Sequence, residues 1–361
     1  MEDENAINEE RKIEHVDMIY NYGMQAAKNW MDEVFLHPRA IPIVDVNEID
    51  ISCSMFGKKF SAPFYVAGMT GGHPKVKAIN EALATACSAA NIPMGLGSQR
   101  AGIDNEDLVD TYRVARDISS DLFLIGNIGM SQLVKAAEPV AVAEKCVSMI
   151  EANALAIHFN KLQELAQPEG DRNFAKILTL LEPITDTIGV PLIVKEVGMG
   201  FSRRDFELLA EYGISAIDVG GYGGTNFTQV ESEREKLANP TITRTIGSVF
   251  KDCGTPTPAS VRLGREFADH DIIATGGIRT GLDIVKVLCS GASMAGMAYP
   301  FLISSMNDVS EGDTAISRCA KEIETLQAEI KVGMALLNAK VVKDLAFSDV
   351  HFSGELSRWL E

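Results

Sequence analysis

The sequence is poor in basic residues and lacks any cysteine pattern typical of a disulfide framework or a zinc site. Its 361 residues include 33 Lys and Arg against 50 Asp and Glu, a formal net charge of −17, which argues against a broad nucleic-acid-binding face. A few local cations can still make one cleft attractive to an anionic substrate. No CxxC pair and no histidine at metal-ligand spacing accompany Cys53, Cys87, Cys146, Cys253, Cys289 and Cys319. We expect buried, reduced thiols and a cytoplasmic protein.

Signals for export and membrane insertion are also missing. The acidic, polar start MEDENAINEERK is unlike a signal peptide. The uncharged stretch 287–307 has the length of a membrane span, but its Gly, Ser and Pro residues fit a helix end, a turn and a buried strand better. No GxGxxG fingerprint follows a first strand, so any nicotinamide cofactor should bind only transiently.

What the sequence does contain is a regular series of eight short apolar runs. They are FYVA (64–67), IPMGLG (92–97), LFLIGN (122–127), ALAIHF (154–159), PLIVK (191–195), SAIDVG (215–220), IIATG (272–276) and SMAGMA (293–298). Such runs are typical of strands buried on both faces. Helical patterns alternate with them, at 75–92, 140–154, 204–215 and 282–292. Eight parallel strand–helix units predict an α/β fold, a (β/α)8 TIM barrel.

We expect one domain covering residues 1–361. Residues 1–62 would form an N-terminal extension with a hairpin around Asn47, residues 63–313 the barrel, and residues 314–361 a C-terminal helical segment. The gap 221–271, between the sixth and seventh strands, is too long for one helix. It predicts an insertion that carries site residues.

Glycine and polar residues gather after nearly every predicted strand, at the end where a TIM barrel places its site. After the last three strands, glycine-rich loops, Arg279 and a helix beginning near Gly281 predict a phosphate site, because backbone amides and helix N-termini bind anions. Thr225 adds a hydroxyl group. Glycines that merely end strands would explain only part of this pattern, since Asn, Lys, Gln, Glu and Arg side chains arrive at the same places.

Two further features point to a functional site but leave its chemistry open. Lys195 ends the fifth strand, where it would face a flavin, form a Schiff base or lie on the surface. His158, Asn160, Gln163 and Glu164 form a compact polar set after the fourth strand. One carboxylate with amides suits Mg²⁺ coordinated through substrate phosphates, whereas zinc would require several His or Cys ligands.

Taken together, the motifs resemble the FMN-dependent, type 2 isopentenyl-diphosphate delta-isomerases. The barrel and GGIR occur in other FMN enzymes, whereas RKIEH, GSQR and HFNKLQE are much more specific. Phe159 stands where leucine is expected, a buried apolar exchange of little consequence. The matching stretches cover nearly the whole chain in order: RKIEH (11–15), MTGG (69–72), GSQR (97–100), HFNKLQE (158–164), QPEGDRNF (167–174), KEVGMGFS (195–202), DVGGYGGTNF (218–227) and ATGGIRTGLDIVK (274–286).

The resemblance implies a role for each matched residue. The flavin ring would contact Met69, Thr70, Ser98, Asn127 and Lys195. The FMN phosphate and ribityl chain would contact Thr225, Gly277, Ile278, Arg279, Ala298 and Tyr299. The substrate diphosphate would be held by Arg11, Lys12, Arg100, His158 and Asn160, with Ser98 and Gln99 adjoining. Glu164 would bind Mg²⁺, and Gln163, also a substrate contact, would lie beside the reacting carbons as the catalytic candidate. The N-terminal Arg–Lys pair, by composition a solvated helix face, would then fold over the site.

The implied reaction is the interconversion of isopentenyl diphosphate and dimethylallyl diphosphate in isoprenoid biosynthesis. Reduced FMN would carry the proton, and NAD(P)H would serve only to reduce the flavin. We expect a small-molecule diphosphate substrate, no nucleic-acid or membrane partner, and a homo-oligomer, either a tetramer or an octamer. Two alternatives stay open: an FMN oxidoreductase such as a 2-hydroxy-acid oxidase, which would need a His base with Arg clamps, and a non-enzymatic flavin-binding scaffold.

Overall fold

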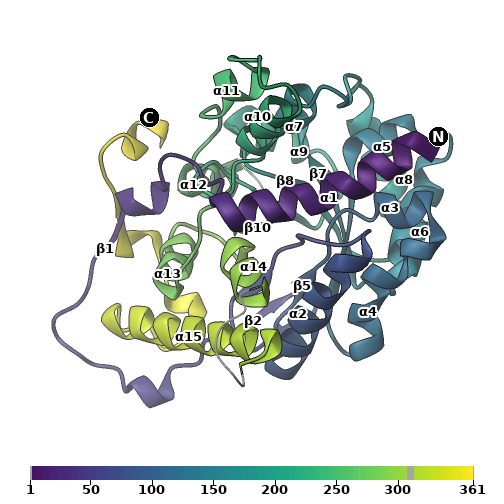
Figure 1. Cartoon of the computed structure of the whole chain (residues 1–361). Coiled ribbons are helices and arrows are strands. Elements are labelled where there is room, and N and C mark those ends of the chain that lie inside the picture. Colours follow the sequence, from purple (N-terminus) through teal and green to yellow (C-terminus); the bar gives the residue numbers. More distant parts are fainter. Residues whose placement is uncertain (1, 268, 307–312, 361) are drawn as a thin grey trace.

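Eight parallel strands close into a barrel in the computed structural model, which describes residues 2–267, 269–306 and 313–360 (Figure 1). The barrel and its eight strands confirm the prediction. They are β4 (Phe64–Val66), β5 (Met94–Gly95), β6 (Leu124–Gly129), β7 (Ala154–Phe159), β8 (Leu192–Glu196), β9 (Ala216–Asp218), β10 (Asp271–Thr275) and β11 (Met294–Met297). Adjacent strands are consecutive in sequence, and β11 pairs with β4 to close the barrel.

Helices cover the outside of the barrel because each strand also buries apolar side chains on its outer face. Two of them are shorter than the sequence pattern suggests. Helix α6 ends at Ile150, since Glu151 adopts a left-handed conformation (φ 49°), and α9 ends at Leu209. The outer helices include α2 (Lys77–Ala90), α4 (Asp110–Ile118), α6 (Pro139–Ile150), α8 (Ile177–Ile188), α9 (Arg203–Leu209), α12 (Thr257–Phe267), α13 (Gly281–Cys289) and α14 (Tyr299–Met306).

Residues 287–306 belong to this barrel wall: they form the end of α13, strand β11 and helix α14. Within the described part of the chain, no helix combines the length and apolar character needed to cross a membrane. The six cysteines are free thiols. The expectation that all are buried is wrong for Cys253, which is exposed, and for Cys53, which is half-buried.

The N-terminal hairpin lies later in the chain than the sequence analysis predicts. It pairs β2 (Cys53–Met55) with β3 (Lys58–Phe60), while 41–46 forms no strand. The turn between them needs two positive φ angles, at Phe56 (51°) and Gly57 (73°). A Phe-Gly turn is a weak signal, because the first turn position usually carries Asn, Asp or Gly.

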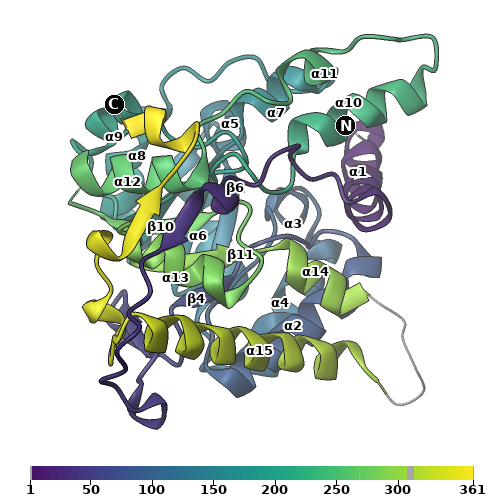
Figure 2. The same ribbon diagram turned by 90° about the vertical axis from the view of Figure 1, so that its left-hand side faces the viewer.

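The two ends of the chain meet in a small sheet that the sequence analysis does not predict. Strand β1 (Val34–Leu36) pairs antiparallel with β12 (Val350–Phe352), so the end of the chain is not wholly helical. The long helix α15 (Ala315–Leu336) precedes it. Figure 2 shows the yellow C-terminal strand beside the purple N-terminal one.

Helix α1 (Glu2–Tyr22) crosses the end of the barrel where the strands terminate (Figure 1). It contacts α3 (Arg100–Asp104) on one side and α10 (Phe227–Ala238) on the other. The segment between β9 and β10 carries α10, α11 (Ile246–Phe250) and α12. The N-terminal extension therefore lies over the mouth of the barrel, held by part of the segment between β9 and β10.

Arg116 of α4 braces the opposite end of the barrel. Its buried guanidinium donates to the carbonyl groups of Ser120, Leu122, Ile150 and Glu151 at 2.7–3.2 Å. These carbonyls precede β6 and β7. One side chain thus satisfies four acceptors, of which the carbonyl groups of Leu122 and Ile150 are buried.

We expect Arg116→Met to lower the free energy of unfolding by about 3 kcal/mol, because buried carbonyl groups lose their donors. Urea denaturation followed by circular dichroism measures this. Arg113→Met is the matched control on the same helix, where the arginine pairs with Glu151 at the surface, and should change stability little. Equal losses in both variants would contradict the assignment.

Candidate functional site

The carboxyl ends of the barrel strands open into two adjoining cavities. The first, about 220 Å³, lies between α1 and the ends of β4–β8. The second, about 100 Å³, lies over the loops that follow β9, β10 and β11. Lys195, Thr225, Ala298 and Tyr299 line both. The two cavities form one continuous site with two halves.

The second cavity is a cradle lined mainly by the glycine-rich loops that follow the last three strands. Gly224 and Gly277 bring the loops after β9 and β10 into contact, and a Cβ on Gly224 would lie 2.5 Å from the amide nitrogen of Gly277. Gly277 also needs a positive φ of 78°. Helix α13 begins just beyond, and Arg279 reaches across from the loop. The closely packed glycine loops and the Arg279 guanidinium fit a phosphate group. The expected contribution of the α13 N-terminus is wrong, because the amides of Arg279 and Thr280 donate to Asp283 Oδ2 and that of Gly281 donates to Glu329.

The linker after α1 seals this cradle, which the sequence analysis missed. Gln25 accepts from Arg279 at 2.9 Å and donates to Thr225 Oγ1 at 3.1 Å. Asn29 donates to the carbonyl group of Gly277 at 3.0 Å. The linker has no recognisable motif, so only tertiary contacts identify these residues.

Lys195 is buried inside the barrel mouth, which excludes the surface alternative. Its ammonium group donates to Asp218 Oδ2 at 2.9 Å, and Asp218 is 1% exposed. Tyr65, on the far side of the barrel, donates to the same oxygen at 2.5 Å. Burial and the Asp218 charge raise the pKa of Tyr65 well above its usual value, so it stays a neutral donor. Lys195 is therefore a fixed cation between the two cavities.

Nearly all predicted site residues line these cavities. The first cavity contains Lys12, Met69, Thr70, Ser98, Arg100, Asn127, His158, Asn160, Gln163 and Glu164, and the second contains Gly277, Ile278 and Arg279. Gln99 lines neither: it is fully buried, with its amide donating to the Cys146 carbonyl and accepting from the Asn127 amide. The Gln99 side chain therefore holds neighbouring segments together and does not reach the cavity. The Arg11 side chain lies outside the described part of the chain.

Lys12 fastens α1 to the loops beneath it. Its ammonium group donates to the carbonyl groups of Gly71 at 2.7 Å and Ser98 at 2.9 Å, and to the hydroxyl of Tyr112. All three partners belong to the glycine-rich loop after β4 or to the elements after β5. A cation from the N-terminal extension is thus placed in the wall of the first cavity.

His158 is a neutral ring whose tautomer is fixed by its neighbour. Asn127 donates its amide hydrogen to the Leu96 carbonyl at 3.0 Å, which turns its Oδ1 toward His158 Nδ1 at 2.7 Å. An amide oxygen only accepts, so Nδ1 carries the hydrogen and Nε2 keeps a lone pair. Burial, with the charges of Lys195 and Lys12, lowers the pKa of His158 to about 4.

Glu164 and Asn160 contribute oxygen atoms to the wall of the first cavity. Glu164 accepts from Asn160 Nδ2 at 2.9 Å and from the Asp171 amide at 2.8 Å. Asn160 Oδ1 is buried and has no hydrogen-bond partner among the described residues. No group of three or more His, Cys, Asp or Glu within the described chain could hold a metal by itself. A hard cation here would need ligands from substrate and water, and this oxygen pair fits that requirement.

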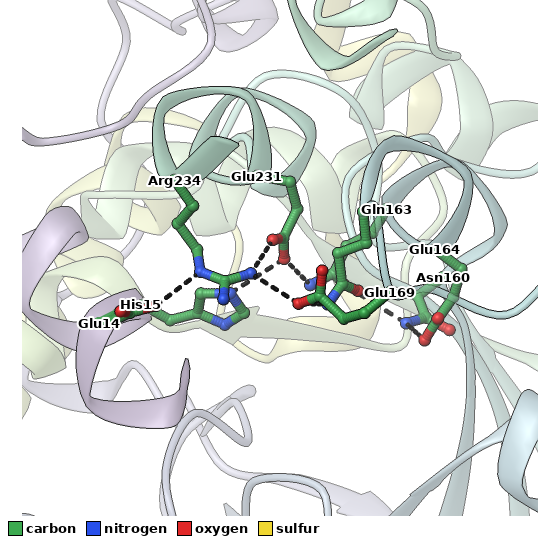
Figure 3. Close-up of polar contacts among 9 residues, drawn as sticks. Glu14, His15, Asn160, Gln163, Glu164, Glu169, Glu231 and Arg234 are labelled. Carbon is green, nitrogen blue, oxygen red and sulfur yellow. Dashed lines mark hydrogen bonds and ion pairs between the residues drawn. The ribbon is translucent and has the colours of Figure 1, made fainter. Parts of the chain in front are cut away.

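Beside these residues lies a charged cluster centred on Glu231 of α10, shown in Figure 3. Glu231 accepts from Gln163 Nε2 at 2.9 Å and from Arg234 at 2.6 Å, and His15 Nε2 lies 2.9 Å from it. Burial alone would raise the pKa of Glu231, but His15 and Arg234 bring it down to about 2. Glu231 and Arg234 are not recognisable as site residues from the sequence, because ESEREK is typical of an ordinary solvated helix face.

Comparison with known proteins first defines the class. The family model described as FMN-dependent dehydrogenase matches residues 20–111 and 161–351. The flavin-binding domain of baker's yeast flavocytochrome b2 has a similar fold, with a TM-score of 0.64, 18% identity, and coverage of 93% of this chain and 82% of that one. A mandelate oxidase mutant with an FMN adduct aligns with a TM-score of 0.59, 14% identity, and coverage of 93% and 91%. The chain is thus an FMN-dependent barrel protein, and at these identities the solved structures show the fold alone.

Curated relatives narrow the class. The isopentenyl-diphosphate delta-isomerase of Archaeoglobus fulgidus is 39% identical over 351 residues, 97% of this chain and 98% of its own. The Methanosarcina mazei protein of the same name is 40% identical, covering 97% and 94%, and that of Halobacterium salinarum 36%, covering 98% and 96%. The chain belongs to the isopentenyl-diphosphate delta-isomerase family, as its motifs indicate.

Gly224→Ala should weaken FMN binding about 10-fold, because the added Cβ forces apart the two loops that form the cradle. Fluorescence titration of the flavin-free protein with FMN measures the dissociation constant. Gly213→Ala is the control, since the nearest atom to its Cβ lies 4.0 Å away. Unchanged FMN affinity in Gly224→Ala would contradict the cradle.

The lowered pKa of His158 predicts a pH dependence of stability. Between its unfolded value of 6.5 and its folded value of about 4, the unfolded chain binds a proton there and the folded chain does not. The stabilising contribution is therefore complete above about pH 6.5 and is lost as the pH falls through about 4, amounting to about 3 kcal/mol. Unfolding free energies of wild type and His158→Gln across this window test this. The variant's curve should be flatter, and His351→Gln, at an exposed position, serves as control. Parallel curves for wild type and His158→Gln would contradict it.

Proposed function

We propose that this protein interconverts isopentenyl diphosphate and dimethylallyl diphosphate, with FMN across the second cavity and the substrate diphosphate with Mg²⁺ in the first. The observation that carries the proposal is the pair of adjoining cavities, one built for a phosphate and the other lined by cations, amides and a carboxylate. A single anion site would suit many flavin enzymes, whereas two adjoining ones suit a phosphorylated cofactor together with a phosphorylated substrate.

The residues of the second cavity fit FMN. The cradle of Gly224, Gly277 and Arg279 would hold its phosphate, with Thr225, Ile278, Ala298 and Tyr299 along the ribityl chain. The ring would extend from the second cavity into the first, where it would contact Met69, Thr70, Ser98, Asn127 and Lys195. When bound and reduced by NAD(P)H, FMN supplies the group that gives and takes the proton. Lys195, held by Asp218, would place a positive charge beside the ring.

The residues of the first cavity would bind the diphosphate. Lys12 and Arg100 supply positive charge, to which Arg11 would add as the family motif implies, while Asn160 and Glu164 would supply oxygen ligands for Mg²⁺. A diphosphate beside His158 Nε2 favours the protonated ring, which turns that atom from an acceptor into a donor. Substrate binding would then neutralise both the cations of the cavity and the diphosphate.

The apolar half of the first cavity would hold the five-carbon chain. Its lining includes Val16 and Ile19 of α1, together with Phe227 and Leu302. Moving a proton on such a weak carbon acid requires a site from which water is excluded. Helix α1 is the element that covers the site, and Gln163 lies in its wall beneath.

Purified protein with FMN, Mg²⁺ and a reductant should convert isopentenyl diphosphate to dimethylallyl diphosphate, followed by proton NMR. Removing flavin or chelating the metal should abolish the reaction, and Glu164→Gln should lower activity and weaken its dependence on Mg²⁺. Full activity without flavin would disprove the proposal. Oxygen consumption with 2-hydroxy acids in place of isomerisation would indicate the oxidoreductase alternative.

A further inference from the structure

Glu231 is the most deeply buried carboxylate near the site, and three elements meet at it. It is 0% exposed. Its oxygens contact Gln163 of α7 (Lys161–Ala166), His15 of α1 and Arg234 of its own helix. Figure 3 shows these side chains converging from separate helices. Burying charges in this way costs desolvation energy that their mutual attraction often fails to recover. Stability alone is therefore a weak explanation for the cluster.

The charge of Glu231 determines which way the Gln163 amide points. An ionised carboxylate only accepts hydrogen bonds, so Gln163 must turn its Nε2 toward Glu231. Its Oε1 is left facing Asn160 Nδ2, at 3.4 Å. At the other end of this series of hydrogen bonds, Glu164 fixes Asn160 in the same way, accepting from Asn160 Nδ2 at 2.9 Å. Two carboxylates thus orient two amides between them, in the wall of the first cavity.

The same carboxylate holds the helix that covers the cavity. His15 of α1 lies 2.9 Å from the Glu231 oxygen that accepts from Gln163. Next to it on α1, Glu14 accepts from Arg234 at 2.8 Å, and Arg234 also pairs with Glu231. The His15 ring packs edge-on against Phe227, with ring centroids 5.9 Å apart. On this side α1 is therefore anchored through the Glu231–Arg234 pair.

We propose that Glu231 is a positioning residue that couples closure of the site to its chemistry, by holding α1 over the cavity and fixing the Gln163 amide with the same carboxylate. This rests on the proposed isomerase function. Glu231 does not touch the substrate. It presents the Gln163 carbonyl oxygen in one orientation only, and a lifted α1 removes His15 from the carboxylate that orients the amide.

The test is Glu231→Gln in the FMN-loaded enzyme. The new amide keeps the shape but offers both a donor and an acceptor, so Gln163 loses its defined orientation. We expect kcat to fall about 10- to 100-fold, as misplacement of a site residue typically costs, while KM changes less than about threefold and FMN affinity is unchanged. Amide hydrogen exchange across residues 12–22 should become faster. Glu233→Gln on the same helix, where Glu233 pairs with Lys236 near the surface, is the control and should behave as wild type.

A second variant keeps the proposal falsifiable if Glu231→Gln folds poorly. In this second variant, His15→Leu, the His15–Glu231 contact is removed and the Glu231–Gln163 hydrogen bond is left in place. The variant should speed exchange in α1 and lower kcat together. Faster exchange with an unchanged kcat would overturn the coupling, as would a Glu231→Gln enzyme with wild-type kcat. An inactive wild-type enzyme would instead reject the isomerase function, because the proposal concerns the ratio of variant to wild type.

Discussion

The site depends on one physical requirement: a carboxylate removed from water must be surrounded by donors. Three buried carboxylates stand around the two cavities, and each accepts a hydrogen bond from at least one residue that lines them. Asp218 holds Lys195 and Tyr65. Glu231 holds Gln163 and Arg234, and Glu164 holds Asn160. These buried carboxylates therefore set the positions and orientations of the polar residues that bond to them.

A fourth carboxylate shows the same principle applied to the backbone. Glu196 ends β8 and accepts from the amides of Val197, Gly198 and Met199 at 2.6–2.9 Å. Burial raises its pKa to about 7, although these amide bonds oppose the rise. The loop it shapes packs against the glycine-rich loop after β9, where a Cβ on Gly220 would lie 1.8 Å from the Glu196 carbonyl oxygen. Side-chain charge and glycine contact together define this part of the rim.

The N-terminal extension turns an open barrel mouth into a covered site. It does so through separate contacts: Lys12 with the loops after β4 and β5, His15 with α10, and Gln25 and Asn29 with the cradle. Each is a polar contact between an extension residue and a residue distant in sequence. Because one segment covers both cavities, it contacts the phosphate half and the substrate half of the site together.

The sequence by itself determined the barrel, the position of its eight strands and many of the polar residues that line the cavities. Buried parallel strands leave a local record, as continuous apolar runs followed by glycine and polar residues at the rim. Only the tertiary structure decided the rest. It placed Gln99 away from the cavity, moved the hairpin to Phe56 and Gly57, and paired β1 with β12. It also brought Tyr65, Asp218, Glu231 and Arg234 to the site, because a contact between residues tens or hundreds of positions apart leaves no local pattern in either segment.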